Sequence, residues 1–122
     1  MRIAVIGVGL IGGSIALAAR ERLEARVVGF DPDIAVGTTA LARGAVEEMA
    51  ASAEAAVSGA ELVFVAAPVS ALGDALDGVL AAAGPDCAVS DVGSTKRAVV
   101  AHCGDPRFIG GHPLAGAETS GV

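Results

Sequence analysis

Residues 2–13 read R-I-A-V-I-G-V-G-L-I-G-G, and this stretch decides the fold class. The run R-I-A-V-I at 2–6 is largely β-branched and typical of a buried strand. Gly7, Gly9 and Gly12 follow at the spacing G-x-G-x-x-G, and apolar residues then recur at helical spacing up to Arg20. A strand that passes through such glycines into a helix indicates a βαβ unit that can hold a phosphate group.

The rest of the chain continues this alternation. Further strands are predicted at 26–30, 62–66, 87–91 and 108–109, with a short extended piece near Val46. Helices are predicted at 34–43, 52–57, 69–83 and 95–102. Strands that alternate with helices imply right-handed crossovers and a parallel sheet. We therefore predict an α/β fold, a Rossmann-type doubly wound parallel sheet, with residues 1–122 forming one dinucleotide-binding domain.

Composition limits the partners of this domain. The chain has 122 residues, of which 53% are hydrophobic, and this share excludes intrinsic disorder. Its net charge of −6 argues against nucleic acid or an anionic membrane as the main partner. Cys87 and Cys103 form neither a Cys-x-x-Cys pair nor a Cys/His ligand spacing. We therefore expect no metal site, and two free thiols in a reducing cytoplasm.

Each position of the glycine motif has a mechanical role. Gly7 permits a tight turn, Gly9 lets a pyrophosphate approach the backbone, and Gly12 lets the helix lie against the strand. The N–H groups of Leu10 and Ile11, at the start of the helix, are expected to face the phosphates. The alternative is that the glycines only shape a turn.

Asp31 ends the second strand, about 20 residues after Gly12, where an acid accepts hydrogen bonds from the ribose hydroxyls. Its charge would repel a 2′-phosphate, and no arginine follows it, so we predict NAD rather than NADP as the cofactor. The alternative is an ordinary turn residue. Ala67 and Pro68 follow the strand at 62–66 and are expected to line the cofactor crevice, although Pro68 could equally just end that strand.

Two polar segments follow the later strands, D-V-G-S-T-K at 91–96 and G-G-H-P-L-A-G-A-E at 110–118. Because both follow strands of one parallel sheet, Ser94, His112 and Glu118 are predicted to converge near the nicotinamide end of the cofactor. Histidine titrates near neutral pH and can take the proton of a substrate hydroxyl, which a serine hydroxyl can orient. The alternatives are that Ser94 only caps the next helix and that His112 is structural.

The glycine motif at 7–12, the segment at 91–96 and G-G-H-P-L-A-G-A-E-T-S-G at 110–121 together resemble the prephenate/arogenate dehydrogenase (cyclohexadienyl dehydrogenase) family. The resemblance covers essentially the whole chain. It implies NAD-dependent oxidative decarboxylation of prephenate or arogenate to 4-hydroxyphenylpyruvate or tyrosine, a step of tyrosine biosynthesis. Hydride leaves the ring carbon that bears the hydroxyl, the ring carboxylate leaves as CO₂, and the ring becomes aromatic.

The resemblance also implies roles for single residues. His112 would polarise or deprotonate the ring hydroxyl, Ser94 would hold that hydroxyl and the imidazole, and Glu118 would belong to the substrate mouth. Three positions depart from the usual Met, Lys and Gly of the family, namely Leu114, Thr119 and Arg97. Thr119 thus removes a cation that the family has near the substrate mouth.

Members of this family carry a helical second domain, which supplies the dimer interface and an arginine for the substrate carboxylate. The present chain ends at Val122. We therefore expect it to be the N-terminal portion of a cytoplasmic, homodimeric enzyme, and to be weakly active or inactive alone. Two alternatives are another Rossmann dehydrogenase of the β-hydroxyacid type and a dinucleotide-binding module without catalysis.

Overall fold

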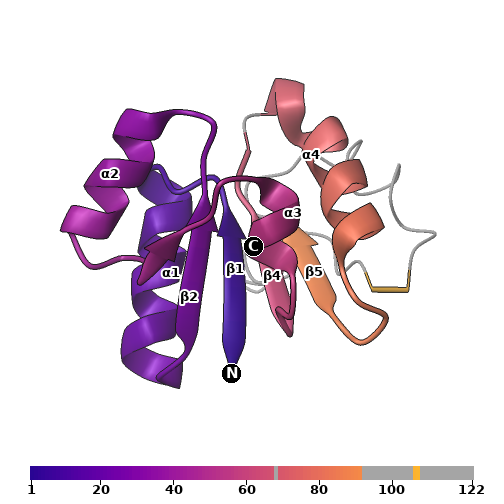
Figure 1. The fold of residues 1–122 in the computed structure, drawn as a ribbon, viewed down its shortest axis with the longest axis horizontal. Helices are drawn as coiled ribbons and strands as arrows, with labels where there is room; N and C mark the ends of the chain where they lie inside the picture. The colour runs from indigo at the N-terminus through magenta and orange to yellow at the C-terminus, as the bar shows by residue number, and fades with distance from the viewer. Residues whose placement is uncertain (68, 92–105, 108–122) are drawn as a thin grey trace, which may run out of the picture.

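The computed structural model describes residues 1–67, 69–91 and 106–107 (Figure 1). The elements in chain order are β1 (Arg2–Ile6), α1 (Leu10–Leu23), β2 (Arg26–Phe30), α2 (Ile34–Ala42), β3 (Glu48–Met49), α3 (Ala53–Val57), β4 (Leu62–Val65), α4 (Val69–Ala82) and β5 (Ala88–Asp91). The predicted alternation of strands and helices is confirmed up to residue 91. The helix predicted at 95–102 and the strand predicted at 108–109 lie outside the described residues.

The strands form one parallel sheet in the order β3-β2-β1-β4-β5. The chain first extends the sheet on one side of β1 and then crosses to the other, so the switch point lies between β1 and β4. Ile6 is level with Phe30 on one side and with Val65 on the other, and Val65 is level with Asp91. Four strands therefore end along one line. This confirms the predicted Rossmann-type α/β fold, which places ligands at that edge.

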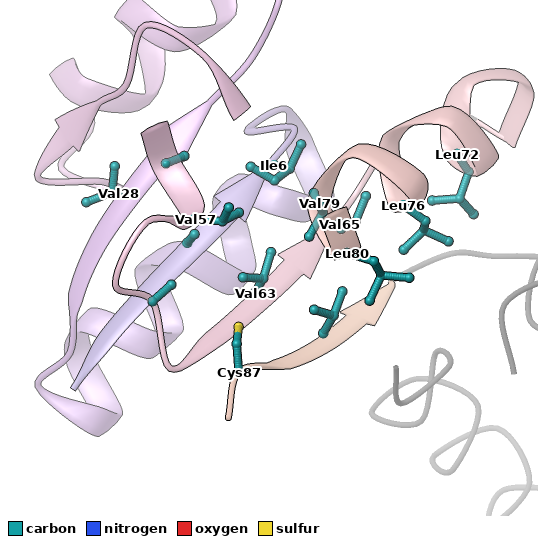
Figure 2. Close-up of a cluster of buried hydrophobic side chains, with 14 residues drawn as sticks. Ile6, Val28, Val57, Val63, Val65, Leu72, Leu76, Val79, Leu80 and Cys87 are labelled. Carbon is teal, nitrogen blue, oxygen red and sulfur yellow. The ribbon is translucent and has the colours of Figure 1, made fainter. Parts of the chain in front are cut away.

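The hydrophobic core has two halves because successive strand residues point to opposite faces of the sheet. Ala4 and Ile6 of β1 belong to one half, and Ile3 and Val5 belong to the other. The first half packs against α3 and α4 through Val57, Leu72, Leu76 and Val79 (Figure 2). The second packs against α1 and α2 through Ala16, Ala19 and Ala40. The buried residues that α1 and α2 contribute to this half are alanines, so both helices can lie close to the sheet.

The third strand differs from the prediction. An extended piece was expected near Val46, but β3 is Glu48–Met49, and it pairs with Val28 and Gly29 of β2. Val46 is instead buried in the core, where a Cβ on Gly29 would lie 3.0 Å from its Cγ1 atom. The side chain of Val46 fills the space beside Gly29, and β3 begins two residues further along the chain.

In the part of the chain that the structure describes, no helix combines the length and the apolar character needed to cross a membrane. The same residues contain no group of three or more His, Cys, Asp or Glu side chains placed to hold a metal ion. Cys87 is a buried free thiol, and Cys103 lies outside the described residues.

Candidate cofactor site

Two glycines of the motif are required by the backbone around them. Gly7 has a φ of +91°, and a Cβ there would lie 2.8 Å from the carbonyl oxygen of Ala66. A Cβ on Gly12 would lie 1.7 Å from the carbonyl oxygen of Gly7 and 3.2 Å from the Cβ atom of Ala66. The first turn of α1 therefore lies directly against the glycine turn and the end of β4. Any side chain at either position would push these elements apart.

Gly9 has different surroundings. Its φ is −71°, and a Cβ there would meet no atom of the described residues within 4 Å. Gly9 is also the N-cap residue of α1, and no side chain of the described residues caps this helix. The first N–H groups of a helix have no partner within the helix, and together with the helix dipole they favour an anion. The space at Gly9 is therefore open at a point where the backbone can bind a phosphate.

The N-termini of α2 and α3 are closed in a different way. The side chain of Asp33 accepts a hydrogen bond from the N–H of Ala35 at 2.9 Å, and Ser52 does the same for Ala55 at 3.1 Å. Both helices thus begin with an ordinary side-chain cap. Among these three helices, only α1 begins at the edge of the sheet with its N-terminus left to a ligand or to water.

Asp31 lies beside the glycine turn. Its Oδ2 atom accepts a hydrogen bond from the N–H of Val8 at 3.1 Å, and its Oδ1 atom accepts one from the N–H of Asp33 at 2.9 Å. The N–H of Gly7 donates to the carbonyl oxygen of Phe30 at 2.7 Å. The end of β2 and the turn after β1 are therefore joined by two hydrogen bonds, and the acidic side chain predicted to bind ribose forms one of them.

Val8 is a site residue that the sequence analysis did not single out. It is buried, with 4% of its surface exposed, and a Cβ on Gly29 would lie 2.9 Å from its Cγ1 atom. Gly29 was the available signal, because a glycine inside a strand often marks the close approach of another group. Here that group is the side chain of the turn residue that hydrogen-bonds to Asp31.

A cleft of about 350 Å³ begins at the turn and continues between α1 and α2. Val8, Gly9 and Leu10 line it at the turn, and Val36 and Thr39 line it on α2. Leu10 and Ile11 themselves are 86% and 54% exposed. The open space at Gly9 is thus continuous with a hollow on the surface, so a ligand can reach the start of α1 from solvent.

The remaining predicted residues fall into two groups. Ala67 lies beside the turn, since a Cβ on Gly7 would be 3.4 Å from its backbone nitrogen. The structure thus brings together Gly7, Gly9, Leu10, Ile11, Gly12, Asp31 and Ala67. Pro68, Ser94, His112 and Glu118 lie outside the described residues. Asp91, which opens the segment containing Ser94, is fully buried at the end of β5.

Relatives of known sequence align with almost the whole length of this chain. It is 38% identical to the prephenate dehydrogenase of Bacillus subtilis (strain 168) and 34% identical to the cyclohexadienyl dehydrogenase of Zymomonas mobilis, over 98% of its length in each case. It covers only 34% and 42% of these two proteins. The chain therefore spans between a third and somewhat over two fifths of their length.

Solved structures show the same fold. The arogenate dehydrogenase of Synechocystis is 27% identical, with a TM-score of 0.75 over 90% of this chain and 40% of that one. A complex of Aquifex aeolicus prephenate dehydrogenase with hydroxyphenyl propionate and NAD⁺ is 23% identical, with a TM-score of 0.77 over 95% of this chain and 42% of that one. Residues 15–122 match the family "Prephenate dehydrogenase, nucleotide-binding domain". This match covers most of the sequence, and the chain therefore belongs to the prephenate dehydrogenase family, in which it corresponds to the nucleotide-binding domain.

Proposed function

We propose that residues 1–122 form the NAD-binding domain of a cytoplasmic, NAD-dependent prephenate or arogenate dehydrogenase. The observation that carries the proposal is the uncapped N-terminus of α1 at Gly9, with the carboxylate of Asp31 beside it. The pyrophosphate of a dinucleotide would accept hydrogen bonds from the N–H groups of Leu10 and Ile11. Ala67 and Pro68 would line the crevice on the side of β4. The open space at Gly9 fits such a group, because a methyl group there would touch only the ligand.

The choice of NAD over NADP rests on Asp31. Each of its carboxylate oxygens accepts one backbone N–H, and each keeps a second lone pair. Two ribose hydroxyls could therefore donate to the same carboxylate without displacing its present partners. The 2′-phosphate of NADP would instead meet a negative charge at this position. We therefore expect a clear preference for NAD.

The chemistry of the family indicates a role for each of the remaining predicted residues. When bound, NAD supplies the acceptor for the hydride that leaves the ring carbon bearing the hydroxyl. We assign His112 as the acceptor of the hydroxyl proton, Ser94 as the residue that holds the hydroxyl and the imidazole, and Glu118 as part of the substrate mouth. Loss of CO₂ makes the ring aromatic and drives the reaction, so the protein needs to supply orientation and one proton acceptor. The motif at 110–121 and the family match support this assignment.

The relatives are more than twice as long as this chain. We assign the functions that residues 1–122 do not supply to the additional part of a full-length protein of this kind. It would supply the homodimer interface and an arginine for the substrate carboxylate. Residues 1–122 would then bind the cofactor and contribute half of the active site. We expect the isolated chain to turn over substrate weakly or not at all.

Calorimetric titration of the chain with NAD and NADP tests the cofactor assignment. We expect NAD to bind at least about tenfold more tightly, which corresponds to ~1.4 kcal/mol for the repelled 2′-phosphate. Equal or tighter binding of NADP would contradict the role of Asp31. Absence of binding by either dinucleotide would contradict the assignment of the cofactor site to this chain.

A second experiment tests the catalytic assignment in the full-length protein. His112→Gln should abolish most prephenate- or arogenate-dependent formation of NADH, because it removes the proton acceptor. His102→Gln is the matched control, since it changes the other histidine of the chain and should leave the rate unchanged. Equal rates for both variants would favour a dinucleotide-binding module without catalysis.

A further inference from the structure

We propose that Asp31 is also a positioning residue, which holds the glycine turn in its binding conformation before a dinucleotide arrives. The proposal rests on the cofactor function proposed above. It adds a role that does not involve the ribose hydroxyls, because it acts through the backbone of Val8. In this view the residue that selects the cofactor also prepares the backbone that binds its phosphates.

The geometry around Val8 supports this role. Its N–H donates to Oδ2 of Asp31 at 3.1 Å, across 23 positions of the sequence. The preceding residue, Gly7, has a positive φ and donates its own N–H to the carbonyl oxygen of Phe30. The following residue, Gly9, is the N-cap of α1, and its carbonyl oxygen accepts the N–H of Gly13 at 2.7 Å. Val8 therefore lies between the last bond to β2 and the first bond of α1, and the side chain of Asp31 supplies its acceptor.

The carboxylate is itself held in place. Its second oxygen accepts the N–H of Asp33 at 2.9 Å, and the side chain of Val8 is buried in the space left by Gly29. A hydrogen bond to a charged acceptor is stronger than one between neutral groups. The backbone of Val8 is thus fixed by a carboxylate on one side and by packing on the other. Because Val8 precedes Gly9, this arrangement determines where the uncapped N-terminus of α1 points.

A consequence distinguishes this role from contact with ribose. Removal of Asp31 should weaken binding even of a nucleotide that has no ribose hydroxyls, because the turn loses its fixed conformation. Electrostatics alone predict the opposite, since removal of a negative charge next to a diphosphate should strengthen binding. Weaker binding of this nucleotide by the variant would therefore indicate that the glycine turn has lost its fixed conformation.

The test compares ADP with 2′,3′-dideoxyadenosine 5′-diphosphate by calorimetry. We expect Asp31→Ala to weaken binding of the dideoxy compound by about fivefold to tenfold, the range expected for one net hydrogen bond. Asp31→Asn keeps one acceptor oxygen and should fall between the wild type and Asp31→Ala. Asp33→Asn is the matched control, since it removes the same charge two residues away, still caps α2 and leaves the acceptor of Val8 in place. It should bind the dideoxy compound as tightly as the wild type or more tightly.

Amide hydrogen exchange of Val8 in the absence of nucleotide tests the hydrogen bond itself. Exchange should be about tenfold faster or more in Asp31→Ala and unchanged in Asp33→Asn. Unchanged exchange in both Asp31 variants would overturn the positioning role alone. So would unchanged affinity for the dideoxy compound with loss of affinity only for ADP, because Asp31 would then only contact ribose. If the wild type bound neither nucleotide, the proposed cofactor function would fail, and the role of the turn in binding would fail with it.

Discussion

Replacing Gly9 and Gly12 by alanine, one at a time, should separate cofactor binding from folding. At Gly12 the new Cβ would lie 1.7 Å from the carbonyl oxygen of Gly7, about half of an ordinary contact distance of 3.4 Å. Gly7 is held to β2 by its hydrogen bond to Phe30, and Gly12 is fixed within α1. Relief therefore requires the whole helix to move away from the sheet. We expect Gly12→Ala to lower the free energy of unfolding by about 3 kcal/mol or more.

The same methyl group at Gly9 has no clash to relieve. No atom of the described residues lies within 4 Å of its position, and a φ of −71° suits alanine. The change from glycine to alanine at an N-cap should cost less than about 1 kcal/mol. The methyl group would, however, lie where the pyrophosphate approaches the N–H groups of α1. We expect Gly9→Ala to weaken binding of NAD by at least about tenfold.

Denaturation followed by far-ultraviolet circular dichroism measures the first effect, because the chain has no Trp or Tyr to report by fluorescence. Calorimetric titration with NAD measures the second. Gly73→Ala is the matched control, since Gly73 lies within α4 and its new Cβ would also meet no described atom within 4 Å. It should leave binding unchanged. The reasoning is refuted if Gly9→Ala binds NAD like the wild type, or if it loses as much stability as Gly12→Ala.

Three further predictions concern stability. Leu76→Ala should lower the free energy of unfolding by about 2–5 kcal/mol, because Leu76 of α4 is fully buried in the core, and a shift of the denaturant midpoint would show it. Arg107→Ala should cost about 1 kcal/mol by the same assay, since the guanidinium donates to the carbonyl oxygen of Ala83 at 2.8 Å, just after the end of α4. Burial raises the pKa of the Cys87 thiol above its ordinary value, and the nearby charge of Arg107 opposes this. The folded state therefore keeps the thiol proton to higher pH than the unfolded state does. The free energy of unfolding should fall as the pH rises above the ordinary pKa of a thiol, and it should fall less steeply in Cys87→Ala.

Local patterns were sufficient for most of the elements. The bounds of β1 and β2 agree with the predicted 2–6 and 26–30, because apolar runs and glycines determine them within a few residues. The offset of two residues between Val46 and β3 has a nonlocal cause. Its two residues are a strand only because they pair with Val28 and Gly29, and the apolar Val46 before them packs in the core. A short edge strand depends on its partner, which its own sequence does not reveal.

The candidate site likewise contains features that the sequence predicts and one that it does not. The spacing of the motif was enough to predict a turn at Gly7 and close packing at Gly12, since these are properties of the backbone nearby. The hydrogen bond from Val8 to Asp31 joins residues 23 positions apart, and it depends on β2 lying next to β1. The sequence indicated an acid at the end of β2 but gave no sign of the backbone group that it holds. Contacts of this kind require the sheet order to be known.

The sheet order also gives the two ends of a bound dinucleotide different surroundings. Asp31 follows β2, on one side of β1, whereas Asp91 ends β5, two strands away from β1 on the other side. Neighbouring strands lie about 4.8 Å apart, so Asp91 is roughly 10 Å across the sheet from the end of β1. With its pyrophosphate at α1 and its adenosine ribose at Asp31, an extended NAD would direct its nicotinamide toward β4 and β5. β5 ends at Asp91 on that side, and Ser94 is only three positions later in the sequence, which supports the proposed assignment of Ser94 to the hydride-transfer end of the site.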